Sequence, residues 1–392
     1  MNATIETRGA TEKDYPQIYE LLDKVMYSTS EELKGRYRNY PGTKPEHSRI
    51  TVVDGKVVSH VRLYMAEAYY GNATIKIGFI GDVCTDPEHR RKGYGAACLR
   101  DGIRYFAEKG CHISMIFSGV LGFYASEGWR LYPVSTGVVN VEYLKPVPQE
   151  GNITVRRFER ASDLAAVAEV YEKFNRNRFL AVKRTMEYWQ NSFYWIHGER
   201  EENFYVAEKD DRIIGYSRIS GNQVTEMCYL PEFPEAVPAL WNSIVKWVEH
   251  WDRRGVLEKE LRVSVPTDHA LYPILKRVPL FHEITYYTML LRMISFQGLL
   301  QALIPFFSEH VTEDFSQAFD LDGEIVTLSR ENGRWSVSPE GKDAAAISSE
   351  EFFTRFLGLP VYDPPSRPAE VQDLLVHLFP LHVSHFYHLD SL

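Results

Sequence analysis

The sequence has few cysteines and no long apolar run. Among 392 residues there are four cysteines, no two of them in a Cys-x-x-Cys arrangement and none beside histidines at metal-binding spacing. A thiol-containing cytoplasmic protein is the simplest interpretation. The polar stretch 1–10 has no apolar signal core, and the absence of a run of about 18 apolar residues predicts no membrane span.

A basic surface is also missing. Lysine and arginine number 44 against 53 acidic residues, which gives a formal net charge of -9. Because nucleic-acid binding requires a basic face, nucleic acid is not expected as the main partner. The negative balance is compatible with a cationic substrate, although mild acidity is also ordinary for cytosolic proteins. The length favours about two to four domains.

Two regions of the chain repeat the same order of expected elements. A short strand and a helix are expected at 5–22, and the same pair returns at 155–171. Thr11 and Ser162 are the expected helix caps, because their hydroxyl groups can accept from the first backbone N–H groups.

The rest of each region matches as well. A strand, a tight turn and a second strand are expected at 50–58, where Asp-Gly is a strong hairpin signal, and again at 204–216. Each region ends in an aromatic or β-branched strand, expected at 138–143 and at 285–292. The middle of the chain is therefore expected to copy its first domain.

The end of the chain has a different pattern. Proline and glycine in 145–151 indicate a linker between the two copies. After Met293 the sequence predicts helices at 296–307, 349–357 and 368–375, and strands at 315–321, 324–330 and 334–337. The expected domains are 1–146, 152–292 and 295–392.

One segment between a strand and a helix carries the clearest chemistry. An apolar strand is expected at 77–85, and an apolar-periodic helix follows Ala96. Glycine lets backbone N–H groups wrap an anion, and the start of a helix adds partial positive charge. Three basic side chains at the mouth of the loop add further charge. We therefore interpret the segment as a pyrophosphate-binding loop made of Arg90, Arg91, Lys92, Gly93, Tyr94, Gly95 and Ala96.

Other phosphate-binding motifs fit this loop less well. A dinucleotide fingerprint requires a third glycine, and a P-loop requires Gly-Lys-Ser or Gly-Lys-Thr; neither pattern is present. The remaining alternative is a basic surface turn in which Gly93 and Gly95 have only a structural role.

The pattern Arg90-x-x-Gly93-x-Gly95 after an apolar strand resembles motif A of the GCN5-related N-acetyltransferases (GNAT). The segment 122–129, Gly-Phe-Tyr-Ala-Ser-Glu-Gly-Trp, resembles a later motif of that family, with Trp129 where Phe or Tyr is usual. The resemblance implies that acetyl-CoA is the cosubstrate and that the strand before the loop pairs with its pantetheine arm. Besides the loop, it implies contacts from Val83, Cys84, Thr85, Gly119 and Val120.

The order of domains resembles the Eis-like (enhanced intracellular survival) acetyltransferases. This resemblance implies an α+β fold: two tandem GNAT-fold domains, each a mixed central sheet flanked by helices, followed by a sterol-carrier-protein-like α+β domain. It also implies a homo-oligomer, a hexamer or smaller. The acceptor it implies is a primary amine of a small cationic molecule or of a lysine side chain. Only the first domain carries specific motifs.

The resemblance assigns roles to individual residues. Tyr124 matches the tyrosine beside the CoA sulfur, and a phenol with a pKa of ~10 suits protonation of a departing thiolate. In Eis-like enzymes the C-terminal carboxylate, here that of Leu392, reaches the active site and acts as the base. Asp82 on the central strand is the alternative base. The competing interpretations are a packing tyrosine and a strand-end carboxylate bound to backbone N–H groups.

The remaining expectations concern metals, the acceptor and the second copy. His382, His385 and His388 stand among aromatic residues and leucine, which favours packed or exposed histidines and no metal site. The acceptor-binding side chains stay open between Glu67 and Asp82.

The second copy has Pro231 and Pro234 where a glycine loop would stand. Proline removes the donors that a diphosphate needs, so 152–290 is expected to bind no CoA. The alternative function is a lipid or apolar-ligand carrier with secondary acetyl transfer. A deep apolar cavity inside 295–392 would favour it.

Overall fold

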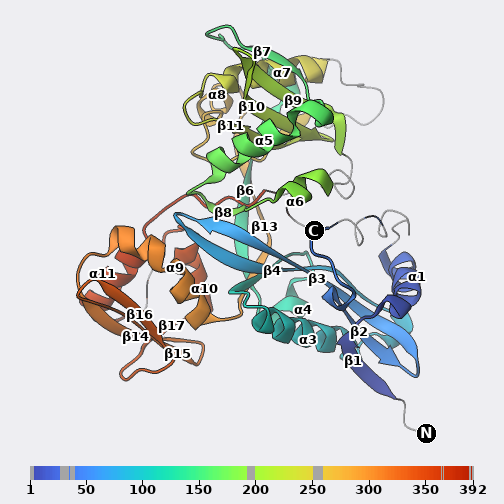
Figure 1. Ribbon diagram of the computed structural model, residues 1–392, viewed down its shortest axis with the longest axis vertical. Helices are drawn as coiled ribbons and strands as arrows, with labels where there is room; N and C mark the ends of the chain where they lie inside the picture. The colour runs from blue at the N-terminus through green and yellow to red at the C-terminus, as the bar shows by residue number, and fades with distance from the viewer. Residues whose placement is uncertain are drawn as a thin grey trace.

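A computed structural model describes residues 4–26, 35, 40–191, 199–249, 259–362, 364, 366–387 and 390. Figure 1 shows three lobes: the first (blue to teal) at lower right, the second (green to yellow) at the top, and the third (orange to red) at lower left. None of the helices in these ranges is long and apolar enough to cross a lipid bilayer.

The first two lobes share one large mixed sheet. Thirteen described strands belong to it, in the order β1-β2-β3-β4-β5-β13-β6-β12-β11-β10-β9-β7, with β8 beside β3. The strands that come first in the chain are β1 (Ile5–Gly9), β2 (Ser48–Val53), β3 (Lys56–Tyr70), β4 (Ala73–Thr85), β5 (Ile113–Phe117) and β6 (Arg130–Asn140). They are followed by β7 (Thr154–Arg157), β8 (Phe179–Val182), β9 (Glu199–Lys209), β10 (Arg212–Ser220), β11 (Gln223–Tyr229), β12 (Glu260–Val263) and β13 (His282–Met293).

The strand order is symmetric about the central pair β13 and β6. β4 pairs with β5 in parallel on one side, and β11 pairs with β12 in parallel on the other. β13 comes from the second region but lies between β5 and β6, whereas β6 comes from the first region and lies between β13 and β12. The two regions therefore exchange their closing strands, and these two strands run between the lobes in Figure 1.

Two local expectations need correction. The closing strand of the first region was expected at 138–143, but β6 ends at Asn140, whose side chain accepts from the Glu142 N–H at 2.9 Å and starts a 3-10 turn. Ser162 does not cap its helix, because the carboxylate of Asp163 accepts from the Glu159 N–H at 2.7 Å and the helix already begins at Arg160. The hairpin after β2 is confirmed, with Val53 opposite Lys56.

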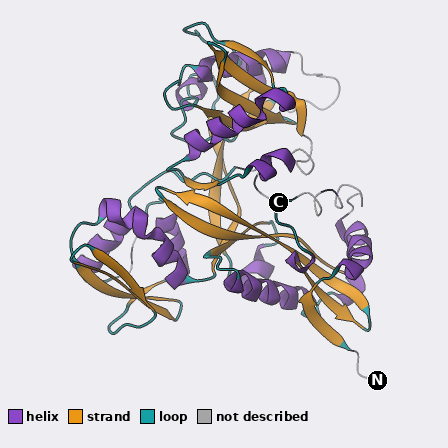
Figure 2. Cartoon of the chain, viewed as in Figure 1, coloured by secondary structure: helices purple, strands orange, loops and turns teal. Residues whose placement is uncertain are grey.

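Helices cover the large sheet in both of the lobes that share it (Figure 2). Those of the first region are α1 (Tyr15–Met26), α3 (Tyr94–Glu108) and α4 (Leu121–Ser126). Those of the second region are α5 (Arg160–Asn175), α6 (Met186–Asn191), α7 (Ala236–Glu249) and α8 (Tyr272–Leu275). α3 packs against β2 and β3, and α5 packs against β10 and β11. The apolar faces of these helices supply the cores on which the site is built.

In the part of the chain that the structure describes, the third lobe has a four-stranded sheet and three helices. Its strands lie in the order β16-β15-β14-β17. The elements are α9 (Phe296–His310), β14 (Phe315–Leu321), β15 (Glu324–Glu331), β16 (Arg334–Ser338), β17 (Ala345–Ile347), α10 (Ser349–Phe356) and α11 (Ala369–Leu378). These bounds agree closely with the segments expected from the sequence.

The interior of the third lobe is filled by its own side chains. Phe296, Phe307, Phe352 and Phe353 are all at most 2% exposed and belong to one core that continues into β4 and β5. A cavity of about 530 Å³ between the end of α9, the start of β14 and α11 is lined by acidic and histidine side chains as well as apolar ones. The packed aromatic interior does not favour an apolar-ligand carrier.

Candidate active site

The chain between β4 and α3 forms a loop in which two residues have left-handed backbone conformations. Arg91 and Gly93 have φ of 62° and 83°, and α3 begins at Tyr94. The first N–H groups of a helix have no acceptor within it. In the described structure the backbone N–H groups of 91–96 donate to no other residue. The loop therefore presents a concave row of donors at a helix start, which is the arrangement that binds anions.

The two glycines of this loop are required for different reasons. Gly93 adopts a backbone conformation that other residues rarely take. At Gly95 an added Cβ would lie 3.2 Å from Thr85 Oγ1 and 3.4 Å from the Phe123 ring. A side chain at 95 would therefore occupy the space between the end of β4 and α4.

A cavity of about 490 Å³ lies over the loop, between the end of β4, the start of α3 and α4. Eleven of the residues named from the sequence line it: Val83, Cys84, Thr85, Arg90, Arg91, Gly93, Tyr94, Gly95, Ala96, Val120 and Tyr124. Lys92 and Gly119 are exposed residues outside the lining. Sequence reasoning missed Val25, His89 and Phe123, although Phe123 stands next to Tyr124 in the later motif.

Tyr124 stands on α4 at the wall of this cavity. Its side chain is buried between Phe123 and Trp129, with ring centroids 5.1 and 6.2 Å away. Burial raises the pKa of the Tyr124 phenol to about 12, and a hydrogen bond with Ser118 opposes part of this rise. The phenol is therefore protonated at neutral pH and can donate a proton to a group in the cavity.

Asp82 lies at an irregularity of the sheet. The register between β3 and β4 shifts between His60 and Arg62, and Asp82 adopts φ of 46°. The imidazole of His60 donates from Nδ1 to the Asp82 carbonyl at 2.9 Å, so Nε2 accepts from the Ser48 hydroxyl at 3.1 Å. The Tyr64 hydroxyl donates to the Asp82 carboxylate at 3.5 Å. Asp82 is not part of the lining of the loop cavity.

His60 holds the backbone of Asp82 in this position, and sequence reasoning missed it. The His60 side chain is fully buried, and this burial lowers its pKa to about 4. A neutral imidazole can donate through one nitrogen and accept through the other, which matches its two partners. The only signal in the sequence is a histidine inside an apolar strand, and that pattern does not distinguish a structural role from a catalytic one.

The expected base at the chain end lies outside the described residues, because Leu392 is not among them. Asp390 is described and is 4% exposed. It accepts from Arg184 Nε at 2.9 Å and from the Tyr188 hydroxyl at 2.6 Å. Burial raises the pKa of Asp390, and the nearby guanidinium of Arg184 opposes the rise. In the described part of the tail, Phe386, Tyr387 and Asp390 are buried, as the apolar tail predicts.

Glu67 does not contribute to the loop cavity. Its side chain is exposed on β3 and pairs with Lys183 at 3.4 Å.

The histidines near the end differ from one another. His382 stacks on Phe179 with ring centroids 3.6 Å apart, and His385 contacts the ring of Tyr387. His388 lies outside the described residues.

Asp86, Glu88 and His89 form the one group of three potential metal ligands found among the described residues. Asp86 is already paired with Lys24 at 3.0 Å and Lys56 at 3.1 Å. These two ammonium groups compensate its charge, and they hold its pKa below the usual range against the effect of burial. The group therefore fits a structural ion-pair cluster.

The corresponding turn of the second region is closed. Between β11 and α7, the N–H groups of Leu230, Phe233, Ala236 and Val237 all donate to backbone carbonyls, at 2.7–3.1 Å. Pro231 and Pro234 supply no donor. Glu232 and Glu235 carry negative charge and contact Arg212 and Lys209. This turn offers fewer free donors than the first loop, and its charged side chains are acidic where those of the first loop are basic.

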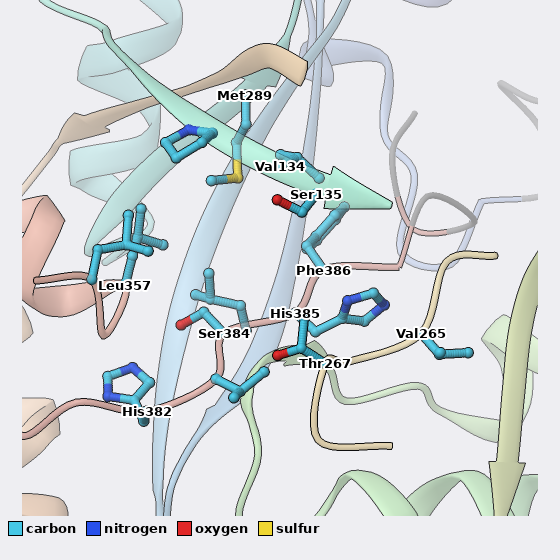
Figure 3. A pocket seen from close by; sticks show the side chains of 14 residues that line it. Val134, Ser135, Val265, Thr267, Met289, Leu357, His382, Ser384, His385 and Phe386 are labelled. Carbon is cyan, nitrogen blue, oxygen red and sulfur yellow. The ribbon is translucent and has the colours of Figure 1, made fainter. Parts of the chain in front are cut away.

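A smaller cavity of about 200 Å³ lies where the three lobes meet (Figure 3). Its walls come from β6 and β13, from the second lobe at Thr267, and from the tail at Ser384 and His385. Burial lowers the pKa of His385 to about 3, so its ring is neutral, and the described lining of the cavity includes no lysine, arginine or carboxylate. The cavity shares no residue with the loop cavity.

Comparison with known families gives one match, and it lies in the first lobe. Residues 6–132 match the model of the family described as acetyltransferase (GNAT) domain. This match contains the loop, the end of β4 and Tyr124. No curated protein matches the sequence.

Solved structures match the chain over its full length. The match to a probable N-acyltransferase from Enterococcus faecalis covers 98% of this chain and 100% of that protein, with a TM-score of 0.76 and 15% sequence identity. The match to a GCN5-related N-acetyltransferase from Anabaena variabilis covers 99% of this chain and 100% of that protein, with a TM-score of 0.73 and 14% identity. The match to Eis1 from Mycobacterium abscessus covers 99% of this chain and 100% of that protein, with a TM-score of 0.68 and 14% identity. At these identities the likeness establishes the fold.

Proposed function

We propose that the protein is an N-acetyltransferase that transfers the acetyl group of acetyl-CoA directly to a primary amine, on a small cationic molecule or a lysine side chain. One observation carries this proposal: a single cavity contains the donor-rich loop, the end of β4 and the protonated phenol of Tyr124. The GNAT family match over 6–132 supports acyl transfer by this lobe.

The residues present fit acetyl-CoA. The N–H groups of 91–96 and the side chains of Arg90 and Arg91 would hold its diphosphate. The end of β4 at Val83–Thr85 borders the same cavity, where the pantetheine arm would lie along the strand. When bound, acetyl-CoA supplies a thioester carbonyl, which is an activated acyl group.

Transfer requires two proton movements by the chain's own groups. The amine must lose a proton before or as its nitrogen bonds to the thioester carbon, and the sulfur must gain one as the C–S bond breaks. In this proposal Tyr124 gives the second proton. The Leu392 carboxylate is our choice for accepting the first, with Asp82 as the alternative base. The proposal includes no covalent enzyme intermediate and no metal.

The remaining assignments follow the same proposal. Residues 1–146 form the catalytic GNAT domain, 152–292 form a degenerate GNAT-like partner that binds no CoA, and 295–392 form a sterol-carrier-protein-like domain. The exchange of β6 and β13 favours a single rigid two-copy unit. We further propose a cytoplasmic homo-oligomer, a hexamer or smaller.

A release assay tests this function. Purified protein is mixed with acetyl-CoA and a panel of polyamines, aminoglycosides, amino acids and lysine peptides, and free CoA thiol is measured. We expect turnover with at least one cationic amine. Propionyl-CoA and longer acyl-CoA donors test the choice of donor. A binding titration that shows no binding of acetyl-CoA at millimolar concentration would overturn the proposal.

A further inference from the structure

The cavity of about 200 Å³ at the meeting point of the three lobes (the junction cavity) is enclosed by segments that lie far apart in the sequence. Its lining comes from β6, β8 and β13, from the chain just after β12, from the chain just after α10, and from residues 382–386 of the tail. Figure 3 shows Ser384 and His385 below Met289 and Val134. A molecule in the junction cavity would therefore contact all three lobes at once.

Most of the wall of the junction cavity is apolar. Its apolar side chains include those of Val134, Leu180, Val265, Met289, Leu357 and Phe386. The described lining contains no lysine, arginine or carboxylate. An ion that entered the cavity would lose its water without gaining an opposite charge, which is strongly unfavourable. The junction cavity therefore suits an uncharged molecule.

Two polar groups in this wall have no hydrogen-bond partner among the described residues. They are Ser384 Oγ and His385 Nε2, and both atoms are shielded from water. Their backbone is held in place, because the His385 N–H donates to the Phe179 carbonyl on β8 at 3.1 Å. A polar atom that is buried without a partner is energetically costly, and most such atoms in proteins are satisfied by protein, water or ligand. These two groups therefore lack a partner that the chain itself does not supply.

Both groups can turn toward the junction cavity without a change in the backbone. A half-turn of the His385 ring exchanges its nitrogen and carbon positions, and the Ser384 hydroxyl can rotate about its side-chain bond. The imidazole is neutral, because burial lowers its pKa to about 3. A neutral imidazole and a hydroxyl can each donate or accept one hydrogen bond. Together they match a single hydroxyl group on a bound molecule.

The volume of the junction cavity limits the size of that molecule. A cavity of about 150 Å³ lined by apolar side chains is known to hold benzene. At about 200 Å³, the junction cavity has room for one six-membered ring and one or two more heavy atoms. The thioether of Met289 and the ring of Phe386 favour an aromatic body, since sulfur and aromatic rings pack well against a ring.

We propose that the junction cavity is a binding site for a small uncharged phenol, with His385 and Ser384 bound to its hydroxyl group and the apolar wall against its ring. The site is separate from the loop cavity, because the two share no lining residue. The proposal therefore goes beyond acetyl transfer and does not depend on it. A phenol bound at the junction stabilises the arrangement of the three lobes.

Three probes of similar shape test the site on the full-length protein. They are p-cresol, toluene, which lacks the hydroxyl group, and p-toluate, which carries a charge. By isothermal titration we expect a Kd of about 0.1–1 mM for p-cresol, binding at least about fivefold weaker for toluene, and no binding of p-toluate at about 5 mM. The Tm should rise with p-cresol, because the ligand binds only the folded state.

Variants of the two polar groups test how the hydroxyl group is recognised. His385→Phe keeps a ring and removes both nitrogens, so the affinity for p-cresol should fall at least about fivefold while that for toluene stays within about twofold. Ser384→Ala should lower the p-cresol affinity about two- to fivefold, and it covers the case in which His385→Phe does not fold. Ser135→Ala is the matched control. Its hydroxyl lines the same cavity but already pairs with Thr285 at 3.2 Å, so the affinity should stay within about twofold.

A variant that fills the cavity tests the location. Val134→Phe places a ring in the junction cavity and should abolish binding of both p-cresol and toluene. The proposal is overturned if wild type does not bind p-cresol, if p-cresol still binds Val134→Phe, or if Ser384→Ala and His385→Phe both keep wild-type affinity. None of these measurements involves acetyl-CoA, so the junction site and the proposed acetyl transfer succeed or fail separately.

Discussion

The two halves of the large sheet have the same strand order and differ in the turn after their fourth strand. After β4 the turn carries three basic residues and two glycines, and its N–H groups are open to the cavity. After β11 the turn carries Pro231, Glu232, Pro234 and Glu235, and the N–H groups of Leu230, Phe233, Ala236 and Val237 donate to backbone carbonyls. The same fold thus holds one basic, glycine-containing turn and one acidic, proline-containing turn. In the proposed function the chemistry depends on the turn and not on the sheet.

The halves also share a buried histidine beside the fourth strand. His60 donates to the Asp82 carbonyl of β4, and His269 contacts the Met227 carbonyl of β11 at 3.1 Å. Each histidine thus contacts the backbone of the fourth strand, and the two halves differ in the turn that follows it. In the second half, the buried Arg184 pairs both with Glu226 on β11 and with Asp390 near the end of the chain.

Substitutions on the short helices α4 and α8 should give the largest difference in kcat between the two halves. Tyr124 lies on α4, which follows β5, and Tyr272 lies on α8, which follows β12. We predict that Tyr124→Phe lowers kcat by about 10²–10³-fold, equivalent to about 3–4 kcal/mol, because the departing thiolate loses its proton donor. The affinity for acetyl-CoA should stay within about twofold.

Tyr272→Phe is the matched control, since this tyrosine is buried in the half without a glycine loop. Its kcat should equal that of wild type. Steady-state kinetics and calorimetric titration measure both variants. A Tyr124→Phe enzyme with wild-type kcat would remove the proposed general acid.

A branched side chain at Gly95 should remove most of the affinity for acetyl-CoA that distinguishes the first turn from the second in the proposed function. Gly95→Val would place methyl groups between Thr85 and Phe123, so we expect the dissociation constant for acetyl-CoA to rise by about 30–100-fold, or about 2–3 kcal/mol. Gly95→Ala should have an intermediate effect, because its Cβ needs only a small shift. Titration checks the series, with circular dichroism as the control for folding. Unchanged affinity in Gly95→Val would place the diphosphate elsewhere.

Acid should destabilise both halves alike. Burial lowers the pKa of His60 to about 4 and that of His269 to about 3, whereas unfolded histidine titrates near 6.5. Each neutral histidine stabilises the fold above pH 6.5, and this stability is lost as the pH falls toward the lowered pKa. We expect about 2 kcal/mol per histidine to be lost between pH 6.5 and 4.5.

Urea unfolding at several pH values measures how steeply the free energy of unfolding falls with pH, provided the transition is two-state at each pH. His60→Gln and His269→Gln should each make this dependence on pH shallower. If only one of them does so, the two halves do not share this support.

Removing single charges at the turns should have the smallest effect on the affinity for acetyl-CoA. Arg91→Ala should weaken acetyl-CoA binding by about 3–10-fold, near 1 kcal/mol, because Arg91 is exposed and its contribution is screened by salt. Glu232→Ala, at the second turn, should leave the affinity unchanged. Titrations at low and high salt check both. A weaker affinity in Glu232→Ala would implicate the second half in binding.

Features that depend on local pattern were predictable from the sequence. The strand 315–321 is found as β14 with the same bounds, and the hairpin after β2 follows from Asp54-Gly55, whose φ values of 50° and 81° suit that turn. The glycine loop and Tyr124 come together in one cavity because both motifs sit at the ends of neighbouring strands.

Features that depend on distant pairing were not predictable. β6 and β13 have similar β-branched and aromatic character, so nothing local indicates that they exchange places. Arg184, Glu226 and Asp390 are far apart in the sequence, and a lone charged residue in an apolar segment does not name its partner. His60 is a similar case, because its role comes from the register shift between β3 and β4.

The most direct test of the account is the number of acetyl-CoA molecules bound per chain. Isothermal titration of the full-length protein should give one site per chain in wild type and in Pro234→Ala, and loss of that site in Gly95→Val. Two sites per chain, or a site that persists in Gly95→Val, would contradict the claim that only the first half of the sheet binds the cosubstrate.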